Sequence, residues 1–204
     1  MISATFEFKS RGLSPGEFPA PQEPAWAKKV DRWNQLDEAA FSLLQAYWDW
    51  KETLAPPSMI FLASPGASNP TDRAFAQSGA VSPARFAHTL PNTRGTALLQ
   101  AMGWSGPLIC LQNGAQTLSS GLLEGVWALS KDVRPRVWVL GVSAKVFGCF
   151  LDYHTTTYSR EPANEPVESL VSDSDLTKWL EAGTPSHPSF VLGGGVQLMR
   201  KNKL

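Results

Sequence analysis

The residues best placed to do chemistry in this sequence form a polar corner, Asn113-Gly114-Ala115-Gln116, between an apolar strand and a helix. In many α/β enzymes a glycine turn of this kind holds the nucleophile, because the first turn of the following helix lies in the positive field of the helix N-terminus. The residue presented here is Gln116, and a carboxamide is no nucleophile. The corner therefore indicates the scaffold of an active site without its reactive atom.

Side chains elsewhere that commonly serve in catalysis or metal binding give no second site. They are His88, His154, His187, Ser119, Ser120, Asp173 and Asp175. The histidines have no metal-ligand spacing with one another or with the cysteines. The serine pair lies within a helix and lacks the glycine elbow of a hydrolase nucleophile, and the aspartates are most simply helix-capping carboxylates. We therefore expect no metal site and no cofactor.

The composition is that of a single globular domain without an electrostatic preference for nucleic acid. Of 204 residues, 43% are hydrophobic, and 18 Lys and Arg balance 18 Asp and Glu, so no basic face is indicated for nucleic acid or an anionic membrane. Eight Trp and ten Phe are many for this length, and they indicate either a permanent protein partner or a core rich in aromatic residues.

The cysteines and the hydropathy of the sequence indicate the cellular compartment of the protein. Cys110 and Cys149 are isolated and lie among apolar residues, which predicts two small core residues and no disulfide. The N-terminal segment lacks the long apolar stretch of a signal peptide, and no apolar run approaches the roughly 20 residues of a membrane-spanning helix. We therefore expect a soluble protein in a reducing cytoplasm.

The corner must be held by alternating strands and helices, and hydrophobic periodicity predicts both. Five strands are expected, at residues 2–8, 59–64, 108–113, 136–144 and 189–194. Helices are expected at residues 25–50, 73–78, 96–102, 116–130 and 174–182, with a further helix starting at Ser82-Pro83. Near-continuous apolar strands such as PLICL and VWVL are typical of a layered α/β sheet that is covered on both faces.

The helix after the corner carries two glycines, Gly121 and Gly125, four residues apart and therefore on one face. Each glycine costs about 1 kcal/mol relative to alanine in a helix, so a close approach by another backbone is one explanation for them. Packing of the helix within its own chain is the other explanation. The sequence leaves both open.

One long stretch resembles, in its motifs, the N-terminal half of a β-ketoacyl synthase, an enzyme of the thiolase fold. This stretch is SPARFAHTLPNTRGTALLQAMGWSGPLICLQNGAQTLSSGLLEGVWALS. The matches to the family pattern are Ser82-Pro83, Phe86, Thr89, Asn92 and Gly106-Pro107, followed by the strand and the corner. The specific similarity covers about residues 59–144. It implies half of a thiolase-like fold in a single truncated domain over residues 1–204, an α/β structure with one mixed sheet and helices packed on its faces.

Two departures from the family pattern bear on activity. Alignment of the corner puts Gln116 where condensing enzymes carry their catalytic cysteine, and glutamine there is similar to chain length factors, the inactive partner subunits of type II polyketide ketosynthases. The family's two catalytic histidines belong to the C-terminal half of the fold, and none of the histidines here lies in such a motif. The chain most resembles the short chain-length-factor-like proteins of aryl polyene and related type II pathways.

This resemblance implies a non-catalytic subunit that forms a heterodimer with an active ketosynthase, meets acyl carrier protein through that complex and helps to wall the acyl-chain tunnel. The tunnel and chain-length residues that it implies are Phe86, His88, Thr89, Asn92 and Gln116. The partner interface that it implies consists of Leu108, Cys110, Gln112, Gly121 and Gly125. Two alternatives stay open: a glutamine-type malonyl decarboxylase for priming, and a homodimeric acyl-chain-binding protein.

Restoring the family residue by Gln116→Cys should not create condensing activity, because the chain lacks the histidine donors that malonyl decarboxylation needs. A thiol at a helix N-terminus is still expected to have a lowered pKa and to react with alkylating agents. The measurement is product chain length from the reconstituted pair, which substitutions of Phe86 or Thr89 should change instead. Condensation by the Gln116→Cys chain without a partner would contradict the non-catalytic interpretation.

Overall fold

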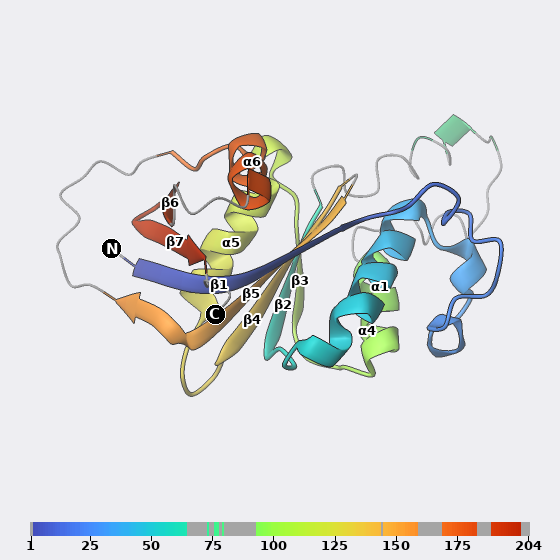
Figure 1. Ribbon diagram of the computed structural model, residues 1–204, viewed down its shortest axis with the longest axis horizontal. Coiled ribbons are helices and arrows are strands. Elements are labelled where there is room, and N and C mark those ends of the chain that lie inside the picture. Colours follow the sequence, from blue (N-terminus) through green and yellow to red (C-terminus); the bar gives the residue numbers. More distant parts are fainter. Residues whose placement is uncertain are drawn as a thin grey trace.

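The computed structural model describes residues 2–64, 73, 76–77, 79, 93–143, 145–158, 169–182 and 189–200. Its centre is one sheet of seven strands in the order β3-β2-β4-β5-β1-β7-β6 (Figure 1). The strands are β1 (Ile2–Gly12), β2 (Met59–Ala63), β3 (Leu108–Leu111), β4 (Arg136–Val142), β5 (Lys145–Tyr158), β6 (Ser189–Gly193) and β7 (Val196–Arg200). The chain thus forms the single sheet that the sequence predicted, with more strands than expected.

The sheet is mixed, and its parallel part carries the corner. β2 lies between β3 and β4 and runs parallel to both, so the carboxyl ends of these strands meet at one edge. β5 returns antiparallel to β4 and is also antiparallel to β1, which in turn runs parallel to β7. Ligand sites of α/β proteins form at the carboxyl ends of parallel strands, and the corner follows β3 at that end.

Helices cover both faces of the sheet and complete three layers (Figure 1). The helices α1 (Glu38–Trp50) and α4 (Thr93–Met102) lie on one face, and α5 (Thr117–Ala128) and α6 (Asp173–Ala182) lie on the other. Short 3₁₀ turns are found at Ala27–Lys29, Trp33–Gln35, Lys51–Thr53 and Gly114–Gln116. Because β2 and β4 are covered on both faces, their side chains are apolar almost without interruption. The predicted α/β architecture is confirmed.

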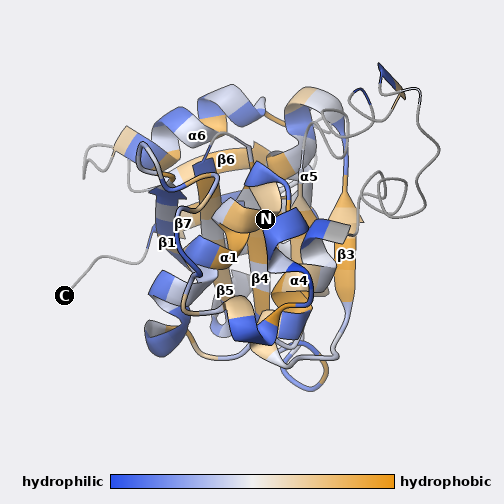
Figure 2. Cartoon of the chain, turned by 90° about the vertical axis from the view of Figure 1, so that its right-hand side faces the viewer, coloured by the Kyte–Doolittle hydropathy of each residue, from blue (hydrophilic) through white to orange (hydrophobic). Residues whose placement is uncertain are grey.

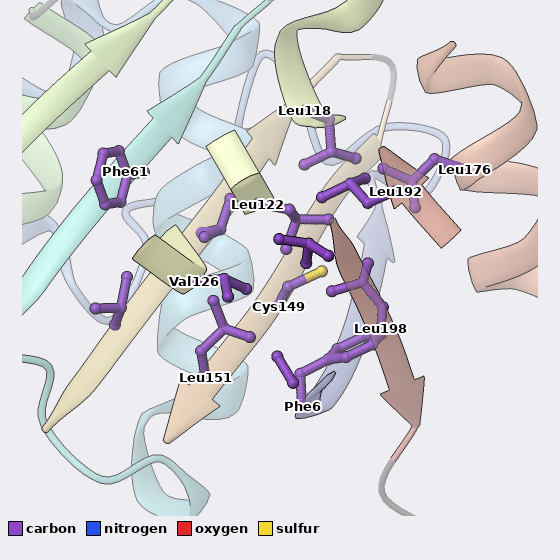
Figure 3. Packing of buried hydrophobic residues seen from close by; sticks show 14 of the residues in the cluster. Phe6, Phe61, Leu118, Leu122, Val126, Cys149, Leu151, Leu176, Leu192 and Leu198 are labelled. Atoms are coloured by element: carbon purple, nitrogen blue, oxygen red, sulfur yellow. The ribbon is translucent and has the colours of Figure 1, made fainter. Parts of the chain in front are cut away.

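The largest core fills the space between the sheet and the helices α5 and α6 (Figure 3). The α5 side chains Leu118, Leu122 and Val126 contribute to it from one face of the helix. From α6 come Leu176 and Leu180, which are 0% and 1% exposed. Complete burial of a leucine side chain stabilises a fold by about 1.5–3 kcal/mol, so α6 is firmly anchored beside α5.

The helix predicted over residues 25–50 is shorter in the structure, where α1 begins at Glu38. The Asp37 carboxylate accepts a hydrogen bond of 2.7 Å from a backbone amide of the first turn and so caps the helix. Upstream, two 3₁₀ turns bring Trp26 against Phe41, with 5.2 Å between the ring centres. The apolar periodicity before Asp37 therefore belongs to a separate packed segment.

The strands β5 and β7 were not predicted, and local features explain why. The turn between β4 and β5 is so short that the Ser143 amide donates to the Lys145 carbonyl at 3.0 Å. The strand predicted at 136–144 therefore extended into this turn and hid the start of β5. The register between β1 and β5 also shifts between Ala4 and Phe6, which breaks the period of two that identifies a strand. β7 has only five residues and directly follows three glycines with positive φ, Gly193-Gly194-Gly195, so the predicted strand at 189–194 ends at the turn before it.

Gly121 and Gly125 face the chain's own sheet, which gives a reason within the chain for two glycines in this helix. A methyl group added at Gly121 would lie 3.1 Å from Val139 of β4, and one added at Gly125 would lie 2.7 Å from the same side chain. The glycines therefore allow α5 to lie close to β4. The predicted close approach exists, but both elements belong to this chain.

Gly125→Ala should destabilise the fold by about 1–3 kcal/mol, because the new methyl group would overlap with Val139 in a packed core. Urea denaturation followed by circular dichroism measures the change. Glu124→Ala, at the exposed neighbouring position of α5, is the matched control and should leave the stability nearly unchanged. A Gly125→Ala protein as stable as the control would show that α5 does not need its close contact with β4.

Candidate functional site

The corner between β3 and α5 is built as a strand, a tight turn and a helix. β3 ends at Leu111, and Gly114 has a φ of 50°, in the left-handed region that glycine adopts without strain. The Thr117 hydroxyl accepts a hydrogen bond from the Asn113 amide at 2.8 Å and donates one to the Gly114 carbonyl at 2.9 Å. These bonds fix the turn and place residue 116 directly before the first turn of α5.

Gln116, which the sequence resemblance aligns with the nucleophile of condensing enzymes, is half-buried and bonded within the chain. Its Nε2 atom donates to the Leu170 carbonyl at 2.7 Å. The side chain thereby joins the corner to the segment that leads into α6. A carboxamide held in this way is a structural tie and offers no nucleophile.

The N-terminus of α5 is capped by a carboxylate from a distant part of the chain. Asp173 Oδ2 accepts from the Leu118 amide at 2.8 Å, and Oδ1 accepts from the Ser119 amide at 2.9 Å and the Ser119 hydroxyl at 3.0 Å. The N-cap residue of α5 makes no side-chain cap, so Asp173 satisfies amides that have no acceptor within the helix. The predicted capping role of Asp173 is confirmed, but the helix that it caps is α5 and not its own.

The helix α6 has a separate cap, which leaves Asp173 free to reach across. Ser172 Oγ accepts from the Asp175 amide at 3.2 Å and donates to the Asp175 carboxylate at 2.8 Å, an arrangement close to a capping box. The hydrogen bond from Ser172 lowers the pKa of the Asp175 carboxyl. Asp173 therefore caps α5, whereas α6 is capped by Ser172, which is bonded to Asp175.

A pocket of about 350 Å³ opens beside the corner, at the carboxyl ends of β2 and β4. Leu118 and Phe147 give it apolar walls, and Asp173 lines it next to them. Lys145 and Glu181 also line the pocket, where their charged groups pair at 2.8 Å. Because Lys145 is paired and the α5 amides bind Asp173, the described walls offer a ligand apolar contact more than charge.

Four of the implied tunnel residues lie outside the described residues, namely Phe86, His88, Thr89 and Asn92. Shortly after them in the chain, Arg94 is buried at the start of α4. Its guanidinium pairs with Asp37 at 2.9 Å and donates to the Ser64 hydroxyl at 2.8 Å, so it fixes α4 to α1 and to the end of β2. No sequence pattern marks the ion pair, because its members are 57 positions apart.

β3 forms one edge of the sheet and pairs with β2 alone among the described strands. The Pro107 carbonyl accepts a hydrogen bond from the amide of Ile60 in β2 at 3.0 Å, and the Leu111 carbonyl accepts one from the amide of Ser64, directly after β2, at 3.2 Å. Since successive residues of a strand alternate in direction, the backbone groups of Leu108 and Cys110 face away from the sheet. Their side chains pack in the core on the α4 side, whereas Ile109 is 38% exposed.

In the part of the chain that the structure describes, the outer edge of β3 is apolar and lacks the usual protection against pairing. Figure 2 shows β3 at one side of the molecule, coloured as hydrophobic. Exposed edge strands commonly carry a lysine or a bulge that prevents pairing with another chain, and the LICL segment of β3 carries neither. The implied interface residues of this strand continue into Gln112, which is exposed. Ile109 was not predicted, although alternation along the strand is the signal that could have found it.

The remaining candidates do not form a second site within the described ranges. His154 is exposed on β5, while His88 and His187 lie outside those ranges. The described residues include no group of histidine, cysteine and acidic side chains arranged to hold a metal ion, and no helix long and apolar enough to span a membrane. Burial raises the pKa of the Cys149 thiol to about 12 and also raises that of Cys110, so neither is a ready nucleophile.

Comparison with known proteins gives a match in structure but none in sequence. No family model matches the sequence, and no curated protein matches it either. The fold is similar to a chain in the structure of a ketosynthase (ApeO) in complex with its chain length factor (ApeC) from Xenorhabdus doucetiae. The match covers 92% of this chain and 94% of that chain, with a TM-score of 0.56 and 13% sequence identity. It confirms the ketosynthase-like fold that the resemblance implied.

Asp173→Asn should lower the free energy of unfolding by about 1–2 kcal/mol, because a carboxamide cannot accept from both α5 amides as the carboxylate does. Asp175→Asn removes a carboxylate from the same turn of α6 without affecting α5, so it should shift the denaturation midpoint much less. Urea denaturation of both variants measures the difference. Equal effects would contradict the assignment of Asp173 to the cap of α5.

Proposed function

We propose that this chain is a non-catalytic, chain-length-factor-like subunit that pairs with an active ketosynthase in a type II polyketide or aryl polyene pathway. The observation that carries the proposal is the corner of this ketosynthase-like fold, where Gln116 donates to the Leu170 carbonyl at the position that the sequence resemblance aligns with the nucleophile. A scaffold retained without its reactive atom supports a role in assembly. The matched structure is itself a ketosynthase in complex with its chain length factor, which supports a partner of this class.

The β3 edge is the surface through which we propose that the two subunits pair. Its outward backbone groups can extend the sheet into a partner strand, and Ile109 adds an apolar contact. Leu108, Cys110 and Gln112 remain in the proposed interface, whereas the two α5 glycines leave it because they pack on β4. The partner supplies the catalytic cysteine and both histidines.

Within the pair, this chain walls one side of the tunnel into which the acyl chain grows. Phe86, His88, Thr89 and Asn92, together with Gln116, are the residues proposed to set the length of the product. A larger side chain shortens a closed tunnel, so substitutions at these positions change the product and leave the partner's chemistry intact. Acyl carrier protein reaches the complex through the ketosynthase.

The electrostatics of the corner do not favour the alternative of a glutamine-type malonyl decarboxylase. Decarboxylation develops negative charge on an enolate, which requires hydrogen-bond donors close by. The first α5 amides donate to Asp173 instead, and its carboxylate opposes further negative charge. Robust release of CO2 from malonyl-carrier protein by the chain alone would contradict the non-catalytic assignment.

Co-expression with the ketosynthase of the same pathway should give one complex, and Ile109→Lys should weaken it roughly tenfold or more, because a lysine on an edge strand disfavours strand pairing. Val191→Lys is the matched control, since Val191 is 48% exposed on β6 at the opposite edge of the sheet. Co-purification and titration calorimetry measure the affinities of both variants.

Two results would contradict this assignment. Equal affinities of the Ile109→Lys and Val191→Lys variants would exclude pairing through β3. A chain that forms a stable homodimer and shows no affinity for the ketosynthase would favour the acyl-chain-binding alternative, and the mass of the protein expressed with and without the ketosynthase distinguishes the two.

A further inference from the structure

The start of α5 has the donors that make such a corner chemically useful, and they are already in use. A helix N-terminus stabilises negative charge because its first amides have no acceptor within the helix. In this chain the Leu118 and Ser119 amides donate to Asp173 at 2.8 and 2.9 Å, and the Ser119 hydroxyl adds a third hydrogen bond. The amides that could stabilise an anion therefore already bind a carboxylate of the same chain.

We propose that Asp173 is an internal plug of the corner, so that the chain is inactivated twice, once by glutamine at the nucleophile position and once by a resident carboxylate. The proposal deepens the non-catalytic role and rests on it. A thioester oxygen or a malonyl carboxylate that approached α5 would meet negative charge where a working corner offers free donors. Asp173 thus acts as a blocking residue and takes no part in any reaction.

The plug is held on both sides. Gln116 ties the Leu170 carbonyl to the corner at 2.7 Å, shortly before Asp173 in the chain. After Asp173, α6 packs Leu176 and Leu180 into the core that α5 also lines, and Figure 3 shows Leu176 there beside Leu192. Withdrawal of Asp173 therefore requires movement of α6 or of the segment before it, at the cost of packing as well as hydrogen bonds.

The plug changes the pKa expected for a thiol at residue 116. The sequence alone predicts a lowered pKa for the thiol of Gln116→Cys. The substitution removes the bond from Gln116 to Leu170, but Leu176 and Leu180 still pack α6 in the core and keep Asp173 on the α5 amides. The amides are then used and a carboxylate lies at the same helix end, so we expect a thiol pKa at or above the ordinary value of about 8.5. The other charged side chains that line the adjacent pocket, Lys145 and Glu181, offset each other as a pair at 2.8 Å.

The rate of alkylation by iodoacetamide tests the plug in the chain alone. Gln116→Cys should react slowly at pH 7, and Gln116→Cys/Asp173→Asn should react roughly tenfold faster, because removal of the carboxylate and release of the amides favour the thiolate. Gln116→Cys/Asp175→Asn is the matched control, since Asp175 bonds to Ser172 and not to α5, and it should react like the single variant. The native thiols give little background because burial raises the pKa of both.

Equal rates for the two double variants, each shown to be folded by circular dichroism, would overturn the plug. The pH profile of Gln116→Cys gives a second test that does not depend on the stability of an Asp173 variant. A thiol pKa at or above about 8.5 supports the plug, and a pKa well below that value overturns it. Neither assay involves the ketosynthase, so failure of the plug is distinguishable from failure of the proposed pairing, which co-purification measures.

Discussion

A helix that begins inside a protein needs acceptors for its first amides, and α5 has none from its own N-cap side chain. Asp173 supplies them from 54 and 55 positions away, and this requirement organises the C-terminal part of the chain. It accounts for the separate cap that Ser172 and Asp175 give to α6. It also accounts for the bond from Gln116 to the segment before α6, which holds the carboxylate in place.

The closed corner and the exposed edge of β3 are the two features on which the proposed function rests. At the corner, the groups that would favour a nucleophile or an anion are satisfied internally. At the edge, the outward backbone of Leu108 and Cys110 and the side chain of Ile109 remain available in the described part of the chain. Both features come from one continuous segment, because β3 leads directly into the corner. In the proposed function, this segment has lost its chemistry at the corner and keeps its means of assembly at the β3 edge.

What the sequence could predict depends on the range of the interactions. The corner was predicted because its strand, its glycine and its helix follow one another along the chain. The target of Asp173 was not, because residues 118 and 173 meet only through tertiary packing. Gly121 and Gly125 revealed a close approach, but the identity of the neighbour depended on which face of α5 meets β4. The strands β5 and β7 escaped prediction because short turns and a register shift interrupt their alternation.

The central claim is that this chain docks on a ketosynthase through β3 while its own corner stays closed. Hydrogen exchange of individual backbone amides, measured with and without the ketosynthase, tests this claim most directly because it monitors the corner and the β3 edge together. We expect the amides of Leu118 and Ser119 to be protected already in the isolated chain. We expect those of Leu108 and Cys110 to exchange readily until the ketosynthase is added and then to become protected. Rapid exchange at Leu118 and Ser119, or β3 amides that the ketosynthase leaves unchanged, would contradict this account.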